Sequence, residues 1–119
     1  MITNISMRIG DGCIIEKHNH ISPDNNPTIV NKEELEKEIK IDVENFNLYR
    51  DPNFTITYSY IVHVDKNGSI TDLTLANASN LWSKDLVDIG ANKLIFEKAL
   101  KDSKPIECMY FVWFRFNKK

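Results

Sequence analysis

Period-two hydrophobicity between Phe54 and Val64 is the strongest constraint on what this chain can fold into. Every second residue of the stretch is apolar or aromatic, and the residues between them are mostly Thr, Ser and His. Such alternation predicts a β-strand with one buried face, because successive side chains point to opposite faces of a sheet. Asn67-Gly68 follows, and since both residue types tolerate positive φ, the pair predicts a hairpin and a return strand over residues 69–76.

Helical periodicity predicts two amphipathic helices beside this sheet. Asn31 and Glu34 have the form of a capping box, which predicts that the first helix begins here. Its apolar residues recur at steps of three and four and share one face: Leu35, Ile39, Val43 and Phe46. The second helix is predicted to begin at Ser79 or Ser83. Its apolar stripe is predicted to consist of Leu86, Ile89, Gly90 and Leu94.

Residues 106–116 form the most apolar stretch of the chain and predict its final strand. One face of this strand consists of Ile106, Cys108, Tyr110, Val112, Phe114 and Phe116. The opposite face carries Met109, Phe111, Trp113 and Arg115. A strand with two apolar faces is either buried on both sides or presents one side to a partner. Two interpretations of the second face follow: it packs beneath the first helix, or its residues bind a partner protein.

The N-terminal part of the chain is less regular. Residues 1–30 are predicted to form an N-terminal arm or a short hairpin around Asp11-Gly12, with residues 1–15 able to add strands to the sheet. Residues 31–119 are predicted to form the domain that contains the helices and the other strands. The expected fold class is therefore α+β, with a three-stranded antiparallel sheet packed by one or two helices.

Length and charge narrow the classes of function. A chain of 119 residues fits one domain with a core of its own. Its 15 Lys and Arg residues are spread out and its net charge is -2, so it lacks the basic stripe that binding to a nucleic-acid backbone needs. No run approaches the roughly 18 to 20 apolar residues of a membrane span. Nucleic acid is therefore not an expected partner.

Catalytic and metal-binding chemistry have little support in the sequence. Cys13, His18 and His20 are the only cluster of soft ligands, whereas a structural zinc site normally takes four ligands in paired spacings. The favoured interpretation is solvent-exposed histidines, and a small metal-dependent enzyme that uses this cluster ranks last among the hypotheses. Cys13 and Cys108 permit one disulfide. No nucleophile motif is present, and we expect no catalytic residues, no metal and no cofactor.

Three segments, taken in order, carry a resemblance to a known family. The first reads Val62-His63-Val64-Asp65-Lys66-Asn67-Gly68-Ser69-Ile70-Thr71-Asp72-Leu73. The second reads Phe96-Glu97-Lys98-Ala99-Leu100-Lys101-Asp102-Ser103-Lys104-Pro105-Ile106. The third reads Tyr110-Phe111-Val112-Trp113-Phe114-Arg115-Phe116. Together they resemble the C-terminal domain of TonB-type energy transducers, with Lys98 where that family usually has Pro and Ser103 where it usually has Gly.

The resemblance implies a β-β-α-β order with a leading helix, and a protein-binding function without catalysis. In such domains an extended partner segment pairs with an exposed sheet edge. The final strand is the implied edge, and an outer-membrane transporter is the implied partner. The residues expected to contact that partner are Met109, Phe111, Trp113 and Arg115. Self-association through the same strand would give a homodimer.

A second hypothesis keeps this fold but drops the transport role. It describes a stand-alone interaction protein, such as an inhibitor, an immunity protein or a dimerising domain. The lack of a membrane anchor and a Pro-rich spacer within these 119 residues motivates it. The expected location is the periplasm if the chain is a fragment of an anchored transducer, and the cytoplasm if Met1 is the native start.

Overall fold

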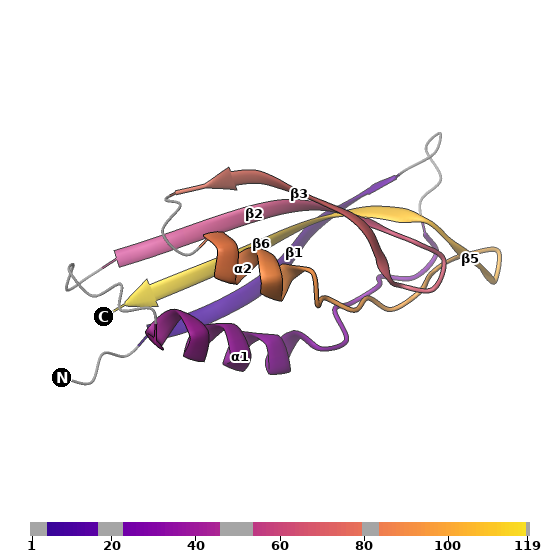
Figure 1. Ribbon diagram of the computed structural model, residues 1–119. Helices are drawn as coiled ribbons and strands as arrows, with labels where there is room; N and C mark the ends of the chain where they lie inside the picture. Colours follow the sequence, from indigo (N-terminus) through magenta and orange to yellow (C-terminus); the bar gives the residue numbers. More distant parts are fainter. Residues whose placement is uncertain (1–4, 17–22, 46–53, 80–83, 119) are drawn as a thin grey trace.

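A computed structural model of the chain places two helices on one face of a four-stranded sheet (Figure 1). The structure describes residues 5–16, 23–45, 54–79 and 84–118. Within these ranges the side chains are described except at residues 5, 11–16, 43–45, 54 and 118. The sheet forms one layer and the helices form the other, so the apolar faces of both meet between the layers.

Helix α1 follows the first strand of the described chain, and α2 separates two groups of consecutive strands. The elements are β1 (Ile5–Glu16), α1 (Lys32–Asn45), β2 (Phe54–Val64), β3 (Ile70–Ala78), α2 (Lys84–Ala91), β4 (Ala99–Lys101), β5 (Lys104–Ile106) and β6 (Cys108–Lys118). The main sheet is antiparallel with the strand order β1-β6-β2-β3, and β4 and β5 form a separate hairpin. The predicted α+β class is confirmed. The predicted three-stranded sheet has a fourth strand, β1, which comes from the stretch that was expected to be able to add strands.

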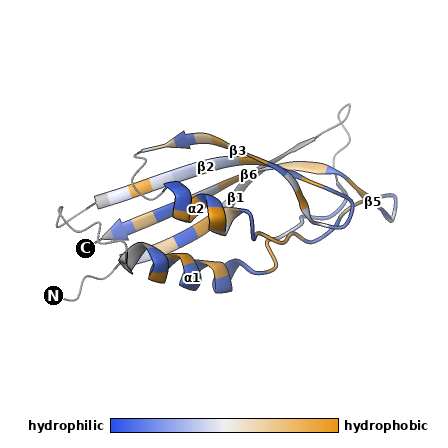
Figure 2. Cartoon of the chain, viewed as in Figure 1, coloured by the Kyte–Doolittle hydropathy of each residue, from blue (hydrophilic) through white to orange (hydrophobic). Residues whose placement is uncertain are grey.

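The core lies between the sheet and the two helices. Alternate residues of β2 and β6 supply most of it, and the rings of Tyr60 and Phe114 meet edge to face with their centroids 5.5 Å apart. Helix α1 contributes Leu35 and Ile39, and α2 contributes Val87. Full burial of an aliphatic side chain of this size contributes about 1.5–3 kcal/mol. Figure 2 shows hydrophilic and hydrophobic residues alternating along both helices, as expected for helices with one buried face.

The hairpin between β2 and β3 forms where Asn67-Gly68 predicted it. The Asp65 N–H donates to the Ser69 carbonyl over 2.9 Å and closes the turn. The Asp65 carboxylate also accepts hydrogen bonds from the N–H groups of Asn67 and Ser69. Within the turn Gly68 alone has a positive φ, 85°. A β-carbon on Gly68 would lie 2.1 Å from the Phe96 carbonyl oxygen, so both the backbone angle and the close packing require glycine here.

Helix α1 begins at Lys32, directly after the predicted cap, but Asn31 does not form the predicted capping box. Its side chain binds residues 93–95 instead. The Nδ2 group of Asn31 donates to the Lys93 carbonyl over 2.7 Å, and Oδ1 accepts from the Ile95 N–H over 3.0 Å. A local motif is thus replaced by a contact distant in sequence, which the spacing of Asn31 and Glu34 does not encode.

Helix α2 confirms its predicted apolar stripe in part, because Gly90 and, beyond the end of the helix, Leu94 are buried. Val87, Gly90 and Ala91 are buried, whereas Ile89 is 58% exposed. Ser79 does not cap this helix, because it extends the β2–β3 pairing through hydrogen bonds with Thr57. The alternative cap, Ser83, lies outside the described residues.

The final strand is shorter than predicted at its beginning. It starts at Cys108, because Lys104–Ile106 pairs with Ala99–Lys101 in the β4–β5 hairpin. Asp102 and Ser103 form the turn of this hairpin with φ of 51° and 66°. These left-handed values match the right-handed twist of the strands, as two-residue hairpin turns require.

Strand β1 runs unbroken through Asp11-Gly12, so the predicted hairpin at this position is wrong. It pairs with β6 from Ile5 opposite Lys118 to Glu16 opposite Cys108. The register shifts between Asp11 and Ile14, which marks an irregularity of the bulge type. The residues that predicted a turn therefore bend a strand, and the predicted N-terminal arm is an integral part of the sheet.

Strand β6 lies inside the sheet, and this corrects the prediction that the final strand is an open edge. β1 pairs with one side of it and β2 with the other. A partner segment, or a second copy of the chain, cannot pair along β6 unless it displaces one of these strands. The sequence did not reveal this because the strand that closes the edge comes from the opposite end of the chain.

Candidate functional site

The residues predicted to bind a partner share one face of β6, opposite the core. Met109, Phe111 and Trp113 are half-buried, and Arg115 is exposed. We call this side of the main sheet the open face; its described members on β6 and the two neighbouring strands include Arg8, Gly10, Thr57, Ser59, Ile61, His63, Met109, Phe111, Trp113 and Arg115. Helix α1 packs on the other side through Leu35 and Ile39, so the interpretation that this face lies beneath the first helix is wrong.

Apolar side chains occupy the middle of the open face. Phe111 of β6 stands directly opposite Ile61 of β2, and Met109 stands opposite His63. Cross-strand neighbours of this kind contact each other, which accounts for the partial burial of the aromatic rings. The parts of these half-buried side chains that stay accessible form an apolar row along β6, and contiguous apolar surface can mark an interaction site.

Trp113 lies across the neighbouring strand at Gly10. The two residues are paired in register, and a β-carbon on Gly10 would stand 2.0 Å from Cζ2 of the indole. The guanidinium carbon of Arg115 lies 5.1 Å from the indole centroid, within the range of a cation–π contact. The indole thus contacts both the glycine of the neighbouring strand and the arginine two residues further along its own strand.

A hollow of about 450 Å³ lies where Trp113 meets the outer edge of β1. Its walls come from three elements and consist of Arg8, Ile9, Gly10, Lys32, Glu36 and Trp113. The Glu36 carboxylate accepts a hydrogen bond from the Ile9 N–H over 3.0 Å. This contact occupies one backbone donor on the outer edge of β1, where a bare edge would be open to strand pairing. Arg8, Lys32 and Glu36 were not predicted as site residues, because no local pattern in the sequence places β1 beside β6.

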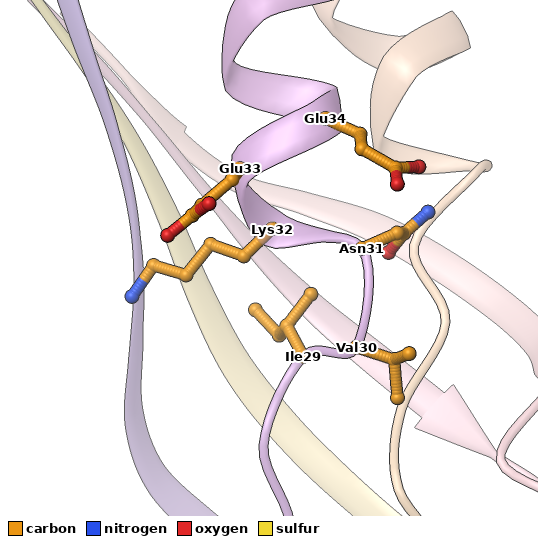
Figure 3. Close-up of a pocket in the computed structure, with 6 residues that line it drawn as sticks. All are labelled: Ile29, Val30, Asn31, Lys32, Glu33 and Glu34. Atoms are coloured by element: carbon orange, nitrogen blue, oxygen red, sulfur yellow. The ribbon is translucent and has the colours of Figure 1, made fainter.

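A second hollow, of about 310 Å³, lies at the beginning of α1 and is lined by residues 29–34. Figure 3 shows the Lys32 and Glu33 side chains extending from α1 toward β1, while Asn31 and Glu34 lie on the other side of the helix. Asn31 is already bound to residues 93–95. Lys32 lines both hollows, so its ammonium group belongs to the surface that joins α1 to β1.

Strand β3 forms the other end of the sheet and pairs with β2 alone. Its sequence, Ile70–Ala78, contains no Lys, Arg or Pro, the residues that most often protect sheet edges. Two register shifts in its pairing with β2, near Ser59 and near Val64, bend the strand. The two ends of the sheet therefore differ: Glu36 covers part of the β1 edge, and no such contact is present at β3 within the described residues.

The predicted metal cluster and disulfide lie outside the described residues. The structure describes neither His18 nor His20, nor the side chain of Cys13. Elsewhere in the described ranges, no group of His, Cys, Asp and Glu side chains is arranged to hold a metal ion. Cys108 is buried in the core. None of the helices that the structure describes combines the length and the hydropathy needed to cross a membrane.

No known protein family, curated protein or solved structure matches this chain. The open face and its hollow therefore have to be interpreted from their own chemistry.

Proposed function

We propose that this protein is a protein-binding module, without catalytic activity, that holds an extended segment of another protein on its open face. The observation that carries the proposal is the row of half-buried apolar side chains, Met109, Phe111 and Trp113, on the side of the sheet opposite both helices. Tryptophan and arginine are enriched among residues that dominate binding energy, and here Trp113 and Arg115 are stacked together.

The dimensions of this row favour an extended ligand. Met109 and Arg115 are six residues apart on one strand, which corresponds to roughly 20 Å at about 3.4 Å per residue. A partner segment of similar length would contact Met109, Phe111 and Trp113 in turn. The resemblance to TonB-type C-terminal domains supports the same class of ligand.

A selection from a random peptide library tests the proposal. Immobilised wild-type protein is expected to enrich a set of peptides. These peptides should bind the wild type but should not bind the Trp113→Thr or the Phe111→Thr variant. Threonine keeps β-propensity, and circular dichroism and urea unfolding verify that each variant is folded. Ile95→Thr is the matched control, because Ile95 is a 52% exposed apolar residue that does not belong to the open face. If no enriched peptide depends on Trp113 or Phe111, the proposal is wrong.

Strand pairing along β3 is the second candidate mode of binding, and the edge position of Ile70–Ala78, which lacks Lys, Arg and Pro, favours it. A peptide added there would receive main-chain hydrogen bonds from β3. Amide hydrogen exchange separates the two modes. Protection that appears within β3 when a selected peptide is added indicates edge pairing, whereas protection confined to the surroundings of Trp113 and Phe111 indicates binding on the open face.

We propose two alternative biological roles for this binding module. One is a transducer-like domain that binds an outer-membrane transporter, and the other is a stand-alone inhibitor, immunity protein or dimerising domain. The coding sequence upstream of Met1 decides between them: an anchor and a Pro-rich spacer in frame support the first, and a stop codon with a ribosome-binding site supports the second.

A further inference from the structure

The open face carries an unbalanced positive charge in a chain whose net charge is -2. Arg8 of β1 and Arg115 of β6 are paired in register and both are exposed. Like charges directly opposite each other on one face of a sheet are destabilising. Thr57, the neighbour of Arg115 on β2, offers no counter-charge. Two arginines are thus held side by side without a carboxylate in their row.

Nearby carboxylates compensate for only part of this charge. In the part of the chain that the structure describes, neither Arg8 nor Arg115 forms an ion pair. Glu36 lines the hollow with Arg8 and Lys32 and keeps its negative charge while it accepts a hydrogen bond from the Ile9 N–H, so one carboxylate there stands against two cations. On the open face of β3, Asp72 stands opposite His63, roughly 20 Å along β2 from Thr57 at about 3.4 Å per residue.

Lys32 brings a third positive charge to the same place. It lines the hollow together with Arg8 and Trp113, and Figure 3 shows its side chain reaching from α1 toward β1. Arg8 and Lys32 therefore line one hollow with Trp113, and Arg115 lies over its indole, which gives two cations from the sheet and one from the helix. Arginine binds carboxylates through paired hydrogen bonds, so this end of the open face is suited to an acidic group.

We propose that the partner segment is acidic at the end that contacts Arg8, Arg115 and Lys32, and apolar at the end that contacts Phe111 and Met109. This inference rests on the proposed function, because it names the chemistry of the segment that the open face would hold. Charge complementarity selects a carboxylate-bearing peptide as the occupant. The apolar row beyond Trp113 excludes a small inorganic anion as the whole ligand, since such an ion would leave Phe111 and Met109 uncovered.

The peptide selection described above tests the inference when it is repeated with charge variants. Peptides of about ten residues, long enough to cover roughly 20 Å in extended form, are selected on the wild type and on the Arg8→Gln/Arg115→Gln protein. Wild-type peptides should carry clustered Asp or Glu at one end and should bind the double variant about five- to twenty-fold more weakly. Raising the salt concentration should weaken the wild-type complex more than the variant complex.

Lys66→Gln/Lys98→Gln is the matched control. It removes the same charge from two exposed lysines outside the open face and should leave the affinity unchanged. If the selected peptides depend on Trp113 but bind the arginine variant and the wild type equally, the proposed function stands and this inference falls. If no selected peptide depends on Trp113, both fall. Equal weakening by both double variants would show an effect of net charge alone and would also overturn the inference.

Discussion

The indole ring of Trp113 lies directly over Gly10 of the neighbouring strand, at a distance that leaves no room for a β-carbon. Glycine within a strand normally weakens it, because it adds no side-chain packing. Here the large ring covers the position that glycine leaves empty, an arrangement known to rescue glycines in sheets. The pair joins β1 to the row of residues on which the proposed binding depends.

Replacing Gly10 with Ala should displace the Trp113 indole. Overpacking should lower the free energy of unfolding by about 1–3 kcal/mol. The better strand propensity of Ala should offset about 0.5–1 kcal/mol of this loss. Urea unfolding measures the loss of stability, and tryptophan fluorescence in a Trp82→Phe background reports the environment of Trp113. Combining Gly10→Ala with Trp113→Thr should remove most of the penalty. An unchanged emission spectrum in Gly10→Ala would contradict the observed contact.

Much of the fold was predictable wherever the signal is local. The bounds predicted for the strand Phe54–Val64 match β2, because alternation and the following turn lie within one stretch of sequence. Strand β1 was not predicted as a continuous strand, since Gly10 and Gly12 are typical of a loop. Its pairing with β6 joins residues more than a hundred positions apart, as between Ser6 and Asn117. No local pattern encodes such a pairing.

Asn31 provides a second test, because its side chain holds two segments together that are distant in sequence. Asn31→Ala removes a donor to the Lys93 carbonyl and an acceptor for the Ile95 N–H, and should cost about 1–3 kcal/mol. Asn31→Asp keeps the acceptor alone and should cost less. The free energy of unfolding measured by chemical denaturation should therefore be highest for the wild type, lower for Asn31→Asp and lowest for Asn31→Ala. Asn26→Ala, at an exposed position, is the control and should be neutral; equal losses for the two Asn31 variants would argue against the donor contact.

The candidate site was predictable in part, for the same physical reason. Period two placed Met109, Phe111, Trp113 and Arg115 on one face of the final strand, and the structure agrees. It could not show that β6 is an interior strand. The period-two pattern also could not predict that Arg8 and Lys32 lie near Trp113. That prediction requires both the β1–β6 register and the packing of α1 beside β1.

Ser103 is predicted to be a site where glycine stabilises the protein. Its φ of 66° lies in the left-handed region, which side chains with a β-carbon adopt at a cost. Ser103→Gly removes this cost from the folded state, which stabilises the protein. It also raises the entropy of the unfolded chain, which offsets part of the gain, so the net stabilisation should be about 0.5–1 kcal/mol. Thermal unfolding measures it. Ser69→Gly, at an exposed residue without positive φ, is the control and should lose stability by a similar amount. A lower melting temperature for Ser103→Gly would count against the turn geometry.

Tyr60 and Asp88 predict how stability depends on alkaline pH. The buried Tyr60 hydroxyl donates to the Asp88 carboxylate over 2.5 Å, which ties β2 to α2. Burial, together with this hydrogen bond, raises the pKa of Tyr60 above its ordinary value of 10.0. The contribution of the protonated Tyr60 hydroxyl to the free energy of unfolding is therefore complete below about pH 10, and it is lost as the pH rises further. Tyr60→Phe should cost about 1.5–3 kcal/mol at pH 7 and flatten the decline above pH 10. Urea unfolding between pH 7 and 11 measures both effects, and parallel stability curves for the two proteins would refute the coupling.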